Sequence, residues 1–127
     1  MHELSIIYSI LEAAEQEAQR HGEGTMVEAI DLEIGELAGV EISSLEFLWP
    51  AAVAGTILEK AACNIARPAG KARCGSCGHA FAIKQYFDPC PQCGSHWNEI
   101  INGEELRIKS LTITCAQPAV AAATDIN

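Results

Sequence analysis

The sequence predicts an α+β protein in which two helices lie on a small three-stranded sheet, with a zinc-ribbon module inserted between two of the strands. Three observations support this fold class. Apolar residues recur at helical spacing near the N-terminus, apolar and polar residues alternate over 30–34, and two Cys-x2-Cys pairs separated by twelve residues occupy 74–93. With 127 residues and 49% hydrophobic content, the chain can hold one ordinary core and a small additional module.

The first helix is predicted by apolar side chains that recur every three or four residues. This apolar face consists of Leu4, Ile7, Tyr8, Leu11, Ala14 and Ala18. Gly22 is expected to end the helix. The period then changes to two at Ile30, Leu32 and Ile34, which predicts a strand with one buried face.

The second helix is predicted to begin at a capping box formed by Ser43 and Glu46. Pro50 follows too late to be a first-turn proline, and a proline in the interior of a helix lacks the N–H that the helix needs. We therefore expect either a kink at this position or a helix that starts only near Trp49.

The other two strands of the sheet are expected on either side of the cysteine pairs, at 57–65 and 104–113. In the second of these, the alternation changes step between Ile108 and Leu111, which predicts a bulge near Lys109–Ser110. This order predicts a discontinuous domain of residues 1–67 and 102–115 that carries a ribbon domain of residues 68–101. The Ala-rich tail of residues 116–127 has little to bury and is expected to be disordered.

One tetrahedral metal site is predicted by the four cysteines Cys74, Cys77, Cys90 and Cys93. Two disulfides are the alternative, but the N-terminus lacks a basic region followed by a long apolar run, so we expect a reducing, cytoplasmic environment. Zinc is the expected metal, and iron in a rubredoxin-like site is its competitor. Because sulfur fills all four positions, the site is expected to be structural.

The charge of the chain limits its partners. Seventeen acidic and eight basic residues give a net charge of −9, which would repel a phosphate backbone and argues against nucleic-acid binding. No apolar run approaches the ~20 residues that span a bilayer, so no membrane association is expected.

Outside the two cysteine pairs, three of the four histidines and two further cysteines are candidates for metal binding or nucleophilic chemistry. His79 and His96 each follow a cysteine pair and are either surface imidazoles or exchangeable zinc ligands. Cys63 and Cys115 are not strong nucleophile candidates. His2 is different, because the Met1 amine, the His2 backbone nitrogen and the His2 imidazole can close fused chelate rings around Cu(II) or Ni(II).

Four parts of the chain are similar to the HypA family of nickel-insertion accessory proteins. They are Met1-His2-Glu3-Leu4-Ser5, Ile34-Gly35-Glu36-Leu37, the two cysteine pairs, and Gly103-Glu104-Glu105-Leu106-Arg107-Ile108. This resemblance extends from Met1 to about Ile113. Pro50 and the Ala-rich tail have no counterpart in the family pattern.

The resemblance implies a nickel metallochaperone and not an enzyme. It implies that His2, together with the Met1 amine and the His2 and Glu3 backbone nitrogens, binds Ni(II) as transient cargo, with Glu41 or His96 as a candidate further ligand. It also implies structural Zn(II) and a HypB-type GTPase partner. The acceptor would be a [NiFe]-hydrogenase large-subunit precursor or, in some bacteria, urease. A monomer or a homodimer is compatible with it.

Two other classes of protein remain as alternatives. A zinc-ribbon module that binds another protein or a nucleic acid would have no use for the N-terminal chelate, and its nucleic-acid version conflicts with the negative charge. A rubredoxin-like electron carrier would contain iron and would be coloured when purified.

Overall fold

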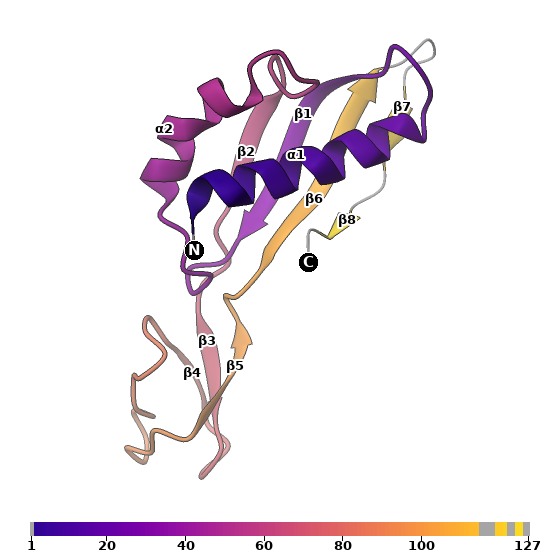
Figure 1. The fold of residues 1–127 in the computed structure, drawn as a ribbon. Coiled ribbons are helices and arrows are strands. Elements are labelled where there is room, and N and C mark those ends of the chain that lie inside the picture. Colours follow the sequence, from indigo (N-terminus) through magenta and orange to yellow (C-terminus); the bar gives the residue numbers. More distant parts are fainter. Residues whose placement is uncertain (1, 115–118, 122–123, 126–127) are drawn as a thin grey trace.

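The computed structural model describes residues 2–114, 119–121 and 124–125. Among these residues, two helices cover one face of a twisted sheet, and a second, smaller sheet extends from one end of it (Figure 1). In chain order, the elements are α1 (Glu3–Gln19), β1 (Met26–Ile34), α2 (Ile42–Val53), β2 (Ala62–Ala66), β3 (Lys71–Cys74), β4 (Ala80–Ala82), β5 (Asn98–Asn102), β6 (Leu106–Thr114), β7 (Ala119–Ala121) and β8 (Thr124–Asp125). The predicted α+β class is confirmed, with the cysteine-bearing sheet inserted between β2 and β6.

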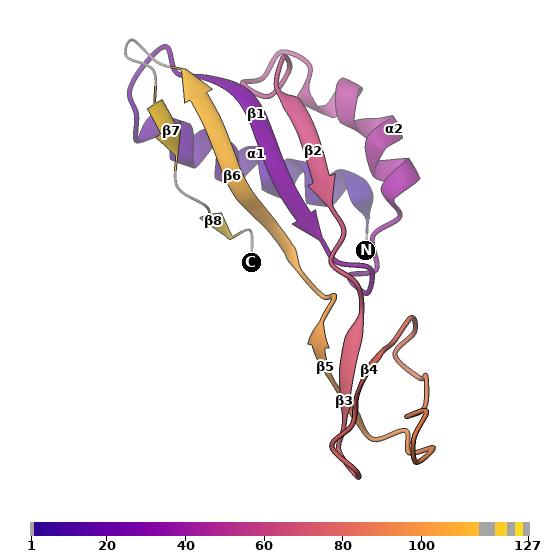
Figure 2. The same cartoon turned by 180° about the vertical axis from the view of Figure 1, so that it is seen from behind.

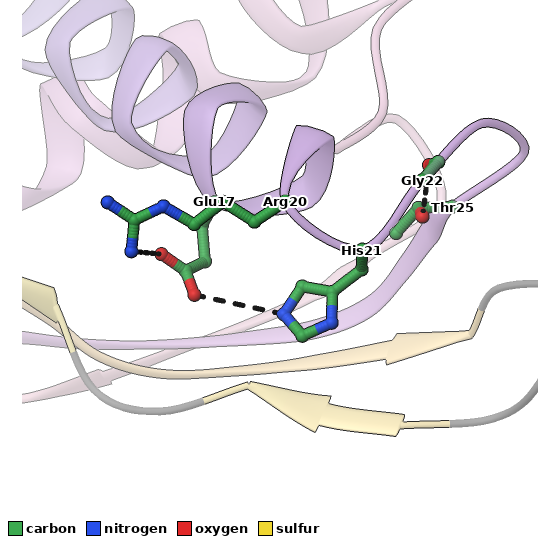
Figure 3. Close-up of polar contacts among 5 residues, drawn as sticks. All are labelled: Glu17, Arg20, His21, Gly22 and Thr25. Carbon is green, nitrogen blue, oxygen red and sulfur yellow. Dashed lines mark hydrogen bonds and ion pairs between the residues drawn. The ribbon is translucent and has the colours of Figure 1, made fainter.

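Helix α1 forms because its apolar stripe is buried against the sheet, with Ile7, Ile10 and Ala14 fully inaccessible to solvent. The helix ends at Gln19, and the chain then turns at Gly22, which has a φ of +96° that favours glycine. Figure 3 shows this end of the helix. There, Glu17 lies 3.4 Å from Arg20 and 3.8 Å from His21, and the Thr25 hydroxyl donates to the Gly22 carbonyl. These contacts are local and fix the start of β1.

The larger sheet has the strand order β2-β1-β6-β7, with β8 also paired to β6. Strand β1 is parallel to β2 and antiparallel to β6. The predicted bulge is confirmed, because Asp31 pairs with Ser110 and Leu32 pairs with Ile108, so that Lys109 is left over. On the other side of β6, β7 and β8 pair with it. These two stretches differ from the expected disordered tail, and the rest of 116–127 lies outside the described residues.

Helix α2 begins earlier than we expected. It starts at Ile42 with Glu41 as the N-cap, and the hydroxyl of Ser43 donates to the Glu41 carboxylate instead of forming a capping box. Pro50 lies inside the helix, so the delayed start near Trp49 was wrong. The proline is tolerated because it is exposed and because the helix packs its buried residues, such as Leu45, against the sheet.

Strand β2 begins at Ala62, later than the predicted start at residue 57. The residues before it form turns that begin at Thr56, whose hydroxyl donates to the Val53 carbonyl and accepts the Leu58 N–H. Leu58 is fully buried, so its apolar character reflects an anchored turn and not a strand.

Each of the two sheets has its own hydrophobic core. The main core lies between the helices and the larger sheet, and the second lies inside the cysteine-bearing module. Leu37, from the loop after β1, belongs to the second core, where it packs with Phe81 and Ile83. The same loop donates its Glu36 and Leu37 N–H groups to the carbonyls of Pro68 and Gly103. The loop therefore fastens the module to the larger sheet (Figure 2).

In the part of the chain that the structure describes, no helix has the length and apolarity needed to cross a membrane.

Candidate metal centres

The four cysteines of the inserted module lie on two turns with the same local geometry. In the first, the Gly78 N–H donates to the Cys74 carbonyl at 2.9 Å, and in the second the Gly94 N–H donates to the Cys90 carbonyl at 2.8 Å. Both glycines have φ near +78°, the conformation that allows the chain to turn back after each pair. Each Cys-x2-Cys segment therefore presents two sulfurs on one side of a tight loop.

The sulfurs of these turns form one cluster. All four lie within 4.8 Å of one another, with Cys74 Sγ 3.5 Å from Cys93 Sγ and Cys77 Sγ 3.7 Å from Cys90 Sγ. A disulfide needs about 2.05 Å, so the disulfide alternative does not fit. Zn–S bonds of about 2.3 Å in a tetrahedron place the sulfurs about 3.8 Å apart. The predicted clustering is confirmed, and the donor set suits zinc or iron.

Backbone N–H groups stabilise the thiolate form of Cys74. The Cys77 and Ser76 N–H groups point at Cys74 Sγ, at 3.4 and 3.3 Å. These donors, Cys77 foremost, lower the pKa of the Cys74 thiol to about 6. The thiolate is the form that binds metal, so this environment favours the metal-binding form of Cys74. The pKa values of the neighbouring Cys77 and Cys93 thiols are raised instead.

The two histidines near the cluster are placed away from its four-sulfur set. The His79 ring stacks on Phe81, with ring centroids 6.2 Å apart and planes 11° apart, and the His79 carbonyl accepts the Cys74 N–H. His96 is exposed, and its carbonyl accepts the Asn98 N–H. Neither imidazole belongs to the group of ligand atoms within 4.8 Å.

At the other candidate site, the structure brings together two residues that are 38 positions apart. The Glu3 carboxylate accepts the backbone N–H of Glu41 at 3.2 Å, so the start of α1 is tied to the start of α2. The carboxylate of Glu41 accepts the Ser43 hydroxyl at 2.5 Å. His2 is the exposed N-cap of α1, and Met1 lies outside the described residues. The predicted candidate Glu41 thus lies beside the N-terminal segment.

This contact also fixes the charge of Glu3. The N–H of Glu41 and then the Glu3 N–H stabilise the ionised carboxylate and lower its pKa below the ordinary value. The sequence pattern gives no sign of this contact, because Glu3 begins α1 and Glu41 is the N-cap of α2, so the two residues are far apart in the chain.

The side chains of His2, Glu41 and His96 do not form a second closed cluster. Among the residues that the structure describes, the four cysteines are the only group of three or more ligand atoms close enough to share an ion. A chelate built from consecutive nitrogens at the chain terminus would need no such cluster, since its donors are already adjacent in the sequence.

A helix-covered sheet with a four-thiol module, and with an exposed histidine beside an acidic loop, defines a small metal-handling protein. The model of one family matches residues 1–113, and its description is hydrogenase/urease nickel incorporation, metallochaperone, HypA. The chain belongs to the HypA family.

Relatives named as hydrogenase maturation factors cover the same region. The chain is 43% identical over 113 residues to the hydrogenase maturation factor HypA of Geobacter sulfurreducens, a match that covers 89% of this chain and 99% of the relative. It is 45% identical to the HypA of Parabacteroides distasonis, with 89% and 97% covered. The solution structure of the Ni metallochaperone HypA from Helicobacter pylori has the same fold, with a TM-score of 0.62, 24% identity, and 87% and 96% coverage.

Proposed function

We propose that this chain is a nickel metallochaperone that binds Ni(II) at its N-terminus and delivers it during maturation of [NiFe]-hydrogenase, with urease as a second destination. Membership of the HypA family carries this proposal. The cytoplasm is the expected compartment. The partners implied by the family resemblance are a HypB-type GTPase and the hydrogenase large-subunit precursor, and no catalytic residue is assigned.

The proposed ligands are the Met1 amine, the backbone nitrogens of His2 and Glu3, and the His2 imidazole. The amine, the His2 backbone nitrogen and the His2 imidazole close fused chelate rings in one plane, which suits Ni(II), and the Glu3 backbone nitrogen is the next donor along the chain. Glu3 is the first residue of α1, so its N–H makes no backbone hydrogen bond within the helix. Its nitrogen can therefore lose a proton and bind nickel without breaking a helical hydrogen bond.

The net charge of the nickel complex also favours this set of nitrogen ligands. The N-terminus of a helix carries a partial positive charge and would repel a bare divalent cation. Two deprotonated backbone nitrogens cancel the charge of Ni(II), so the complex is neutral. Glu41 and His96 remain candidates for a further ligand, and Glu41 is supported by its contact with Glu3.

The zinc module has a different proposed role. With four sulfur donors at tetrahedral spacing, it has no open position for cargo, so Zn(II) is proposed as a permanent structural ion. A carrier must also release its cargo, and the exposed N-terminal segment suits that need better than the buried Cys74 and Cys90 sulfurs.

Transfer to an acceptor tests the proposed function. The nickel-loaded chain should pass its metal to a nickel-free hydrogenase large-subunit precursor in the presence of the GTPase, and a His2→Ala chain should not. Precursor-bound nickel, measured after separation of the proteins, reports the transfer. Equal transfer by both chains would contradict the N-terminal site.

Glu3 is expected to position the N-terminal ligands through its side chain. A Glu3→Ala variant loses the carboxylate that accepts the Glu41 N–H and should bind nickel about 10-fold more weakly, the range for residues that support a ligand. Glu3→Gln keeps an acceptor oxygen and should recover part of this loss. Calorimetric titration with Ni(II) measures both, and Glu12→Ala, an exposed carboxylate further along α1, is the control. Equal affinity of the Glu3→Ala and Glu12→Ala chains would show that the contact does not support the site.

A further inference from the structure

A groove with a volume of about 340 Å³ lies between α2 and β2. Apolar side chains line it from both sides, with Ile42, Leu45 and Trp49 on the helix and Cys63 and Ile65 on the strand, and two charged residues, Glu46 and Arg67, complete the lining. It is separate from both candidate metal centres, because neither the clustered cysteines nor the residues of the N-terminal segment line it.

The strand beside this groove is an unpaired edge. Among the described strands, β2 has a neighbour on one side only, because it ends the order β2-β1-β6-β7. Proline and charged side chains, above all lysine, usually protect an exposed strand edge from pairing with another chain. None of them occurs among the five residues of β2, Ala62–Ala66. In contrast, on the opposite side of the sheet the outer side of β6 is covered by β7 and β8.

The free edge and the groove are adjacent through alternate residues of β2. Cys63 and Ile65 line the groove, and Asn64 between them points to the other face, where it donates to Asp31. A segment that paired with the outer edge of β2 would direct every second side chain toward the same groove. The protein would therefore bind such a segment both by backbone hydrogen bonds to β2 and by apolar contacts in the groove, which is the mode of recognition called strand addition.

Charge selects the partner. Glu46 and Arg67 are the two charged residues that line the groove. The Arg67 guanidinium donates to the Ile34 and Gly35 carbonyls, whereas no ion pair to Glu46 is found among the described residues, so the charge of Glu46 is available to a partner. Burial and then Glu46 raise the pKa of the Cys63 thiol to about 11, so Glu46 also acts on the strand side of the groove. A second copy of this chain would bring the same glutamate and another net charge of −9 to the interface. A basic partner segment would instead be attracted.

We propose that the edge of β2 and the groove beside α2 bind an extended segment of a partner protein by strand addition. The segment has apolar side chains at alternate positions, which enter the groove, and at least one lysine or arginine that faces Glu46. This surface acts independently of nickel binding.

A random-peptide display library, panned on the zinc-loaded chain, provides the probe. The selected peptides should alternate apolar and polar residues and contain an excess of lysine and arginine. A synthetic peptide with the selected sequence should slow amide hydrogen exchange in 62–66. The Glu46→Lys chain should bind it about 10-fold more weakly, whereas Glu12→Lys, with the same change of charge on α1 outside the groove, should bind it as the unchanged chain does.

Three results would overturn the proposal. The first is that no peptide is enriched, and the second is that the enriched peptides protect amides elsewhere and not those of β2. The third is concentration-dependent protection of 62–66 without peptide, together with a dimer in sedimentation analysis, because the occupant would then be a second copy. A nickel titration of the Glu46→Lys chain should match that of the unchanged chain, which confirms folding and separates this surface from the proposed nickel site.

Discussion

Replacing Cys90 with serine is expected to release the zinc ion and to unfold residues 68–101, while the main core stays folded. Two of the six buried residues of the module's core, Cys74 and Cys90, are themselves ligands, so this core loses both its metal and its packing. Binding of structural zinc by small modules amounts to about 10 kcal/mol or more, which exceeds what so small a core can supply. The main core does not depend on the metal, because none of its residues is a proposed ligand.

The matched control is Cys63→Ser, which changes a half-buried thiol outside the cluster. Metal analysis should find about one equivalent of zinc in the control and none in the Cys90→Ser chain. Amide exchange should show loss of protection in β3, β4 and β5 with little change in α1 and β1. A Cys90→Ser chain that stayed protected throughout and kept its zinc would refute a structural role for the site.

Adding a segment of several residues before Met1 is expected to weaken nickel binding by more than about 100-fold, beyond the range for residues that only support a ligand. The extension converts the terminal amine into an amide and moves the free amine away from His2, while the imidazole, the fold and the zinc cluster are unchanged. The fused chelate rings can then no longer close with the same four nitrogens.

A cleavable extension supplies the control, since protease treatment would restore Met1 as the first residue of the same preparation. Nickel titration and the absorption spectrum of planar Ni(II) should recover together after cleavage. If the extended chain already bound nickel as tightly and with the same spectrum, the amine would not be a ligand. The site would then have to use side chains such as Glu41, which lies beside the N-terminal segment.

Several features of the fold could be predicted from the sequence because they depend on local patterns. The period of the apolar residues identified α1 and β1, and the broken alternation in β6 located the bulge at Lys109. The spacing of Cys74, Cys77, Cys90 and Cys93 predicted their clustering, since a Cys-x2-Cys turn determines where its two sulfurs point. Each of these signals is contained within one continuous stretch of the chain.

Tertiary packing determined the features of the fold that local patterns did not predict. Helix α2 accommodates Pro50 because Leu45 and Val53 are buried against the sheet, and the turn before β2 is fixed by the burial of Leu58. The Glu3–Glu41 contact, the insertion of Leu37 into the zinc module and the groove beside β2 all join segments that are far apart in the chain. Periodicity and spacing describe one segment at a time, so they predicted which residues are buried or bind metal. Which segments lie against one another depends on the packing of complete elements, and only the folded structure determined it.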